Sequence, residues 1–406
     1  MPTVHELDVP ELNLEQLGST SQRQAALDAA RDQHWLARNP FGYAVLRYED
    51  CVAILRDRRF HSAAGLITRM AGLPDDHPMN QDRRESILSM EGPGHDRLRR
   101  LAAPAFTPMA ADKLRPFMRS VVNELVDVFA SSGTCELVRD VCEPYPIPVI
   151  CELLGAPKED WRLFSRWATD LLAIFNGNLL EDGARIMAAR DALDEYVGAL
   201  IERRRSSPGD DLLTAMIAAE SQGDRLSSEE LLMMAQAVLV AGTDTTRNQL
   251  ACAVALFADH PDQWRLLADD PSVAQRAVEE SMRVLGAVRG TARFASTDIE
   301  YRDIVFPQGT LVFPSFVSAN ADRHVWTEPE HFDITKPPAS QPHLTFGSGI
   351  HYCLGANLAR AELQEALPIL ARRLPDLVID GQIDWKPTTV GIWGPERVPL
   401  RFTPAD

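Results

Sequence analysis

The stretch 227–258 constrains the fold more than any other part of the chain, because apolar residues recur in it at three- and four-residue spacing. Ser227 is a helix-capping residue, and Glu230, three positions later, completes a capping box. The helix is expected to end before Pro261. At about 1.5 Å per residue, a helix of this length crosses the width of a domain. The sequence therefore predicts a helical core built around it.

Polar residues interrupt this helix at 241–246, which reads Ala-Gly-Thr-Asp-Thr-Thr. Ala241, Gly242 and Thr245 are expected to share one face, because residues three and four apart are neighbours on a helix. Their small side chains would leave room for a flat ligand, and the Thr245 hydroxyl can bond back to the carbonyl of residue 241. A solvent-facing polar stripe is the alternative interpretation.

The segment 346–355, F-G-S-G-I-H-Y-C-L-G, places Cys353 among glycines and shortly before a helix-forming run. Glycine permits tight turns and lets a flat ligand approach the backbone. The unpaired N–H groups and the dipole at a helix start favour a thiolate, and a thiolate facing a planar group suits the axial ligand of a haem. A buried structural cysteine is the alternative, but it explains the glycines, aromatic residue and histidine poorly.

This loop resembles the haem loop of the cytochrome P450 family, whose pattern F-x-x-G-x-[RH]-x-C-x-G it matches at every fixed position. The resemblance implies haem b (heme b) with Cys353 as the proximal iron ligand. It also implies that Phe346 packs near the sulfur and that His351 reaches a haem propionate. The loop residues expected to bind the cofactor are Phe346, Gly347, His351, Cys353 and Gly355.

The helix segment 241–245 is similar to the family motif [AG]-G-x-[DE]-T. By that resemblance Thr245 hydrogen-bonds dioxygen at the haem, and Asp244 relays protons from solvent. Asp244 and Thr245 are therefore the expected catalytic residues, and Ala241 and Gly242 are expected to adjoin the cofactor.

Haem carries two carboxylates that need cationic or hydrogen-bonding partners when buried. His95 and Arg99 are four residues apart and would project from one helical face; their segment resembles the family's H-x-R-L-R. Arg293 resembles a strand arginine with the same role. The resemblance implies that these three residues bind propionates together with His351. Any one of them alone is more often a surface residue.

Glu280 and Arg283 match the family's E-x-x-R motif. The alternative is an exposed helical ion pair worth a few tenths of a kcal/mol. The resemblance implies a buried pair, joined by His331, with the structural role of holding the loop before Cys353. The family's A-N-R-D run reads Ala-Asn-Ala-Asp at 319–322, which leaves the local geometry open.

Further helical patterns occupy 115–130, 159–175 and 185–205, whereas short β signals lie at 43–48 and in the last third of the chain. This pattern favours a mainly α fold with a small β portion, as the cytochrome P450 fold has. We expect a single domain over residues 1–406.

The net charge of −17 argues against nucleic acid and anionic membrane surfaces as partners. No apolar stretch is long enough for a membrane anchor, and the acidic N-terminus does not resemble a signal peptide, so we expect a cytoplasmic protein. Six scattered cysteines form no C-x-x-C pair, which excludes that type of zinc or redox motif. The few lysines beside many arginines indicate a bacterial genome rich in G and C.

Segments that set specificity in the family are mainly apolar here, so we expect a lipophilic substrate such as a terpenoid, steroid, fatty acid or macrolide-like compound. The expected pocket residues are Leu66, Ile67, Met70, Leu73, Leu171, Leu172, Ile174, Phe175, Val238, Val288, Ile392 and Trp393. The sequence contains no flavin or iron–sulfur segment, so electrons are expected from a separate ferredoxin and its reductase. Arg97, Arg100 and Arg360 are predicted to form the docking patch.

Three functions remain open. The first is an O2-dependent monooxygenase. The second is a haem-thiolate peroxygenase or isomerase, which the Asp244–Thr245 pair disfavours because peroxide-using relatives typically lack it. The third is a non-enzymatic haem-binding or sensor protein, which would need neither that pair nor a roomy apolar pocket.

Overall fold

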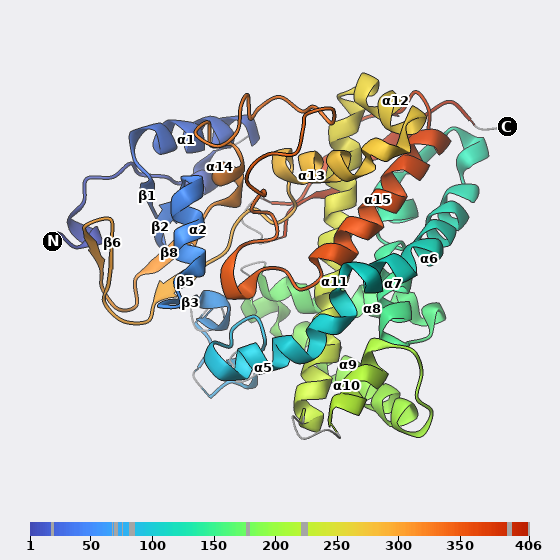
Figure 1. The fold of residues 1–406 in the computed structure, drawn as a ribbon, viewed down its shortest axis with the longest axis horizontal. Coiled ribbons are helices and arrows are strands. Elements are labelled where there is room, and N and C mark those ends of the chain that lie inside the picture. Colours follow the sequence, from blue (N-terminus) through green and yellow to red (C-terminus); the bar gives the residue numbers. More distant parts are fainter. Residues whose placement is uncertain are drawn as a thin grey trace. The chain divides into compact units, whose positions relative to one another are not determined.

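The structure is a computed structural model that describes residues 1–17, 20–66, 68, 72–74, 76–80, 86–175, 179–220, 226–387 and 392–404 (Figure 1). The chain divides into two compact units, each made of discontinuous segments. Unit 1 comprises Met1–Gly92, Met282–Phe332 and Pro337–Cys353, and unit 2 comprises Pro93–Ser281, Asp333–Lys336 and Leu354–Asp406. The expectation of one domain over 1–406 stays a prediction.

Unit 1 is organised around a five-stranded sheet with the strand order β1-β2-β8-β5-β3. β1 (Leu36–Asn39) and β2 (Gly42–Val45) form an antiparallel hairpin. β2 then pairs in parallel with β8 (Leu311–Pro314). β5 (Arg293–Ala295) is antiparallel both to β8 and to the edge strand β3 (Phe60–Ser62). The sheet thus brings strands from both ends of the sequence together.

Short helices and a second hairpin complete unit 1. They are η1 (Val4–Glu6), η2 (Leu14–Gln16), α1 (Thr20–Gln33), α2 (Tyr48–Arg56), η3 (Ala63–Leu66), β6 (Ile299–Tyr301), β7 (Ile304–Phe306), α14 (Phe316–Asn320) and η10 (Gly349–His351). Aromatic rings contact one another in the core of unit 1. Phe306 lies 5.7 Å from Phe60 and 6.3 Å from Trp35, measured between ring centroids. Such tilted and edge-on pairs are the favoured geometry of aromatic rings.

Unit 2 is helical and is centred on α11 (Ser228–Ala258). The predicted capping box is confirmed, because the Glu230 amide donates to Ser227 Oγ and the Ser227 amide donates to the Glu230 carboxylate. α11 packs against α7 (Pro146–Leu154), α8 (Trp161–Leu172) and α9 (Leu179–Ser206), among other helices. Its middle and C-terminal half are therefore mostly buried.

The other elements of unit 2 surround these four helices. They are α5 (Gly92–Ala102), η4 (Ala103–Phe106), α6 (Pro108–Asp127), η5 (Ala130–Ser132), β4 (Thr134–Glu136), the π-helical turn η6 (Val138–Cys142), η7 (Lys158–Asp160), η8 (Ala173–Phe175), α10 (Leu212–Glu220), α12 (Pro261–Asp269), η9 (Pro271–Val273), α13 (Ala274–Val284, which continues into unit 1), α15 (Ala356–Arg373), β9 (Val378–Ile379), β10 (Asp384–Trp385), β11 (Pro395–Arg397) and β12 (Pro399–Arg401). α15 and α6 lie side by side (Figure 1). The strands form two small sheets, β4-β12-β9 and β10-β11.

The mainly α fold with a small β portion is confirmed, and the differences from the predicted bounds have local causes. The predicted helix 115–130 begins earlier, at Pro108, because Thr107 Oγ1 accepts the amide of Ala110. The predicted strand at 43–48 ends early, since the Tyr48 amide donates to Asp322 at 2.9 Å and starts α2 instead. Across the described part of the chain, no helix is long and apolar enough to cross a membrane.

Candidate functional site

The loop that carries Cys353 is a series of tight turns in unit 1. Gly347 (φ +72°) and Gly349 (φ +73°) occupy the left-handed region that favours glycine. The Gly347 amide donates to Leu344 O at 2.7 Å, and the Cys353 amide donates to Phe346 O at 2.9 Å. The last bond ties the two ends of the loop together and leaves the Cys353 side chain half-buried.

Gly349 has a second, steric reason to be glycine. A Cβ there would collide with the main-chain oxygen of Leu55 at the end of α2. The neighbouring Ser348 Oγ accepts a hydrogen bond from Arg56 Nε at 3.0 Å. Gly355, by contrast, belongs to unit 2, has φ −83°, and a Cβ there would meet nothing within 4 Å. The protein backbone itself therefore does not require a glycine at 355.

Arg283 anchors a segment of unit 1 through main-chain carbonyls. Its Nη1 donates to Asn320 O at 3.1 Å and to Pro329 O at 2.7 Å, and its guanidinium lies over the Trp326 ring at 5.4 Å. The His331 carbonyl accepts from Nη2 at 3.5 Å. His331 thus meets Arg283 through its main chain, and its side chain is exposed; its structural role with Glu280 and Arg283 stays a prediction. Glu280 lies in unit 2.

Asn320 links this anchor to the cysteine loop. Its Oδ1 accepts the Leu344 amide at 2.7 Å, and its Nδ2 donates to Thr345 Oγ1 at 3.2 Å. Thr345 in turn donates to Met282 O at 2.8 Å. All three hydrogen bonds are buried, so they hold the backbone directly before Phe346. Sequence reasoning noticed the Ala-Asn-Ala-Asp run but assigned no role to Asn320.

Two expected propionate ligands lie in unit 1. Arg293 on β5 is 5% exposed, and its Nη1 donates to Thr291 Oγ1 at 3.1 Å and Ala292 O at 3.0 Å. Because these acceptors are neutral, burial lowers the pKa of Arg293 to about 10. His351 instead bonds a protein carboxylate: its Nε2 lies 3.0 Å from Glu91 Oε1.

Glu91 is a partner of His351 within the protein, and the role of His351 as a propionate ligand stays a prediction. Burial raises the pKa of Glu91, but the hydrogen bonds from His351 and from the Ser62 amide outweigh it and hold that pKa below its ordinary value. Glu91 precedes α5 by one residue in the sequence, so only the folded chain could reveal this contact.

The two other expected propionate ligands lie on α5 in unit 2. His95 is 1% exposed, with Nδ1 3.4 Å from Asp96 Oδ1, and Arg99 one turn later is half-buried. Their spacing on α5 is the predicted one. Of the docking arginines, Arg100 on the same helix is exposed, while Arg97 pairs with Glu230. Arg360 pairs with Glu279 at 2.6 Å, so two of the three predicted docking charges are partly neutralised within unit 2.

The middle of α11 has one open face. Ala241 is exposed, Thr245 is half-buried, and Thr245 Oγ1 donates to Ala241 O at 2.6 Å, as the sequence predicted. Gly242, which is expected to share this face, packs against another helix. A Cβ at Gly242 would clash with the side chain of Ile150 on α7, so its missing side chain serves helix packing. The reason is tertiary: α7 and α11 approach closely at this turn.

Asp244, the residue before Thr245, is buried, at 9% exposed. Lys386 Nζ lies 3.4 Å from its Oδ2, and Arg247 Nη1 lies 3.5 Å from its Oδ1. Asn248 Nδ2 donates to the Asp244 carbonyl at 2.6 Å. Sequence reasoning missed Lys386, because no motif signals it.

Glu362 on α15 is a buried acid that the sequence did not single out. It is 1% exposed, and Thr246 Oγ1 donates to its Oε2 at 3.2 Å. Burial raises the pKa of Glu362 well above its ordinary value, an effect that the Thr246 hydrogen bond only partly offsets. Burial therefore favours the neutral form of this carboxyl. Tyr145 donates to the Glu362 main-chain oxygen at 2.9 Å and fixes this turn of α15.

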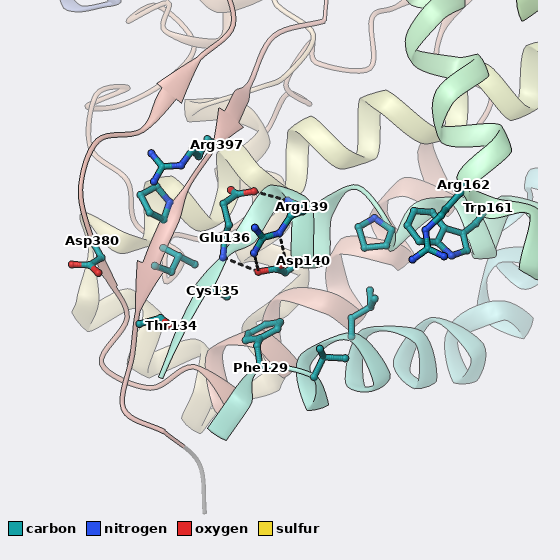
Figure 2. Close-up of a pocket in the computed structure, with 15 residues that line it drawn as sticks. Phe129, Thr134, Cys135, Glu136, Arg139, Asp140, Trp161, Arg162, Asp380 and Arg397 are labelled. Carbon is teal, nitrogen blue, oxygen red and sulfur yellow. Dashed lines mark hydrogen bonds and ion pairs between the residues drawn. The ribbon is translucent and has the colours of Figure 1, made fainter. Parts of the chain in front are cut away.

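A hollow of about 720 Å³ lies in unit 2 between the end of α6, β4, η6 and the start of α8 (Figure 2). Figure 2 shows Glu136, Arg139 and Asp140 gathered in its middle, where Arg139 Nε donates to Asp140 at 2.7 Å. At one side, Arg162 lies over the Trp161 ring at 4.7 Å. None of the predicted site residues lines this hollow, so its size alone does not make it the catalytic pocket.

The expected substrate-pocket residues have mixed positions. Trp393 is 1% exposed and stacks on Trp385 at 4.5 Å, so it packs within unit 2. Val288 packs against the core of unit 1. Ile67 and Met70 lie outside the described residues.

The other cysteines behave mostly as predicted core residues. Cys51, Cys142, Cys151 and Cys252 are buried, whereas Cys135 is half-buried. Burial raises the pKa of the Cys135 and Cys151 thiols to about 12, so neither is a reactive thiolate at neutral pH.

Comparison with known proteins gives consistent matches over the chain. The family model described as Cytochrome P450 matches residues 158–268 and 271–378. Luteothin monooxygenase of Streptomyces thioluteus is 37% identical over 92% of this chain and 91% of its own. Mycinamicin IV hydroxylase/epoxidase of Micromonospora griseorubida is 37% identical over 89% of this chain and 91% of its own. The crystal structure of CalO2 is similar with a TM-score of 0.90 and 29% identity, covering 98% of this chain and 100% of that one.

Proposed function

Since the chain belongs to the cytochrome P450 family and is an oxygen-incorporating oxidoreductase, we propose that it inserts one oxygen atom from O2 into a lipophilic small molecule. Two observations carry this proposal: a loop of glycine turns that holds Cys353 in unit 1, and the adjacent residues Asp244 and Thr245 on α11 in unit 2. A non-enzymatic haem protein would need only the first of them.

The residues present suit haem b. Cys353 would be the axial thiolate, and Arg293, His95 and Arg99 would hold the propionates. Arg293 supports this most directly, because a buried guanidinium bonded to neutral groups gains from an anionic ligand. His351 would also hold a propionate if it left Glu91 or bound Glu91 and the propionate together. When bound, the haem supplies the chemistry of oxygen activation, with the thiolate raising electron density at the iron.

The protein's own contribution on the helix side is proton handling. Thr245 carries its hydroxyl on the open face of α11. Asp244, the preceding residue, is buried. This arrangement would let Asp244 receive a proton from the water side and Thr245 pass it to the reacting oxygen. A reaction driven by hydrogen peroxide has no need of such delivery.

We propose a hydrophobic substrate of the terpenoid, steroid, fatty-acid or macrolide-like class. The relatives named as a mycinamicin hydroxylase and a steroid monooxygenase support this range. Electrons would come from a ferredoxin in the cytoplasm, docked near the exposed Arg100. Reversing Arg100 to glutamate should then slow reduction by ferredoxin, and an unchanged rate would remove that site from the proposal.

The first test is the reduced, carbon-monoxide-bound spectrum of the purified protein. A thiolate-ligated haem gives a long-wavelength Soret band, which should be present in the wild type and lost in Cys353→Ala. Cys135→Ala is a matched control, because that half-buried cysteine lies in unit 2 and should leave the band unchanged. A band that survives in Cys353→Ala contradicts the ligand assignment.

The second test is turnover with a ferredoxin, its reductase and NADPH. Thr245→Ala should lower product formed per NADPH by about 10-fold or more, with the electrons recovered as hydrogen peroxide, whereas Thr245→Ser keeps the hydroxyl and most of the coupling. Equal product from hydrogen peroxide alone in wild type and Thr245→Ala would instead favour a peroxygenase.

A further inference from the structure

Lys386 contacts the Asp244 carboxylate from outside helix α11. Its Nζ lies 3.4 Å from Oδ2 and 3.5 Å from Oδ1, and Arg247 Nη1 lies 3.5 Å from Oδ1 on the helix side. The Lys386 and Asp244 side chains are 15% and 11% exposed. Because both are largely removed from water, solvent screens this pair less than a surface ion pair.

The three distances exceed the ~2.7–2.9 Å of a tight charge-assisted hydrogen bond. The two cations therefore restrain the carboxylate without locking it in one hydrogen-bond geometry. A cavity of about 10 Å³, room for a single water molecule, adjoins Asp244 and is also lined by Glu143 and Ser165. Ser165 donates to Glu143 Oε1 at 2.7 Å. Asp244 thus has two cationic neighbours, Lys386 and Arg247, and one acidic neighbour, Glu143. The cations limit the orientations of its carboxylate but still allow it to rotate.

Main-chain contacts within the β10–β11 hairpin (described residues 384–387 and 392–397) fix the position of Lys386. Its amide donates to Gly394 O at 3.0 Å, and its carbonyl accepts from Trp393 Nε1 at 3.0 Å. The Trp385 and Trp393 rings stack with an interplanar angle of 8°. Lys386 is therefore held in place beside the stacked Trp385 and Trp393 rings.

The same hairpin is seated on α11 one turn beyond Asp244. A Cβ at Gly394 would lie 2.6 Å from Asn248 Oδ1, so only glycine permits this approach. Asn248 in turn donates to the Asp244 carbonyl. The close contact at Gly394 and the ion pair at Lys386 are thus two attachments between one hairpin and one helix.

We propose that Lys386 is a positioning residue for proton delivery, which makes the orientation of Asp244 depend on the described part of the β10–β11 hairpin. In the coupled reaction, two electrons and two protons reduce O2 so that one oxygen enters the substrate and the other leaves as water. In the uncoupled reaction, the same electrons and protons release hydrogen peroxide. Without Lys386 the carboxylate samples more orientations, proton delivery to the Thr245 side slows, and peroxide release grows. The inference rests on the proposed function, since Asp244 relays protons only in an O2-activating enzyme.

The test compares Lys386→Met, Lys386→Arg and the control Lys158→Met, which removes an exposed lysine of unit 2. Product and hydrogen peroxide per NADPH are measured in the holoenzyme with ferredoxin and reductase. Lys386→Met should lower product per NADPH by about 3- to 10-fold, a fraction of a full acid–base contribution, and Lys386→Arg should restore it to within about 2-fold. In an Asp244→Asn background, Lys386→Met should cause no further loss, because the lysine acts through that carboxylate.

A second readout is independent of turnover: amide hydrogen exchange over 384–397, which should be unchanged in Lys386→Met if the hairpin stays seated. The proposal is overturned if Lys386→Met forms as much product per NADPH as Lys158→Met, or if it causes the same loss of product in the Asp244→Asn background as in the wild type. It is also overturned if Lys386→Arg forms as little product per NADPH as Lys386→Met, or if the amides of the whole hairpin exchange fast. Failure of the proposed function is recognised separately, because the wild type would then lack the thiolate-type spectrum or O2-dependent product.

Discussion

Replacing Gly349 by alanine tests whether backbone geometry positions the cysteine loop. Its φ of +73° lies in the left-handed region, which costs an alanine about 1–2 kcal/mol. The new Cβ would also collide with the Leu55 main-chain oxygen, and because that neighbour is backbone, α2 or the loop has to shift. Overpacking of this kind costs about 1–3 kcal/mol. The two contributions together lower the free energy of unfolding by about 2–5 kcal/mol.

The matched control is Gly355→Ala, the same substitution at a position with φ −83° and open space around its Cβ. For a chain of 406 residues, an unfolding entropy of about 2.1 cal/mol/K per residue converts the Gly349→Ala cost into a fall in Tm of about 2–6 °C. Thermal unfolding of the haem-extracted proteins by circular dichroism measures it. Gly355→Ala should change Tm by less than about 1 °C.

Haem content, measured as a haem-to-protein ratio, separates the roles of the two glycines. If a flat cofactor presses on Gly355, its alanine variant loses haem while keeping the stability of the polypeptide. The reasoning fails if Gly349→Ala unfolds at the wild-type temperature, or if Gly355→Ala loses as much stability as Gly349→Ala.

Three further predictions concern buried polar groups, and urea unfolding measured by circular dichroism checks each. Asn320→Ala leaves the Leu344 amide buried without its acceptor and should cost about 2–4 kcal/mol, whereas Asn320→Asp keeps an acceptor oxygen and should cost less. The folded protein lowers the pKa of Glu91, so the stability that its bond to His351 contributes is present above the ordinary glutamate pKa and is lost as pH falls through the folded value. Glu91→Gln should therefore cost about 1–3 kcal/mol at pH 7 and progressively less as pH falls through the folded pKa of Glu91, and a difference that stays constant with pH would contradict this. Burial raises the pKa of Glu362, so wild-type stability is fully present below the ordinary glutamate pKa and falls as pH rises above it toward the folded value. Glu362→Gln should match wild type below the ordinary glutamate pKa and become progressively more stable than wild type as pH rises.

Features that depend on neighbours along the chain were predictable. The capping box at Ser227 and Glu230 uses groups three residues apart, and α11 begins and ends within one residue of the predicted 227–258. The back-bond from Thr245 to Ala241 is likewise set by one turn of helix. The left-handed turns at Gly347 and Gly349 are consistent with the glycine spacing of the loop.

Contacts between distant segments were not predictable. Lys386 and Asp244 are 142 residues apart, and nothing near Lys386 in the sequence marks it as the partner of an acid. Glu91 and His351 are 260 residues apart, so the carboxylate that occupies His351 was missed. The contact that requires a glycine at 242 was missed for the same reason, because the side chain of Ile150 belongs to another helix.

The sequence by itself determined which residues can do the chemistry: a thiol in a glycine loop, and an acid and an alcohol adjacent on one long helix. Spacing within a helix or a turn encodes those, since the backbone repeats every few residues. Tertiary structure alone decided what surrounds them. Asp244 contacts cations, His351 contacts a carboxylate, and Asn320 holds the backbone before the cysteine loop, in each case where packed elements meet. Burial from water strengthens each of these polar contacts.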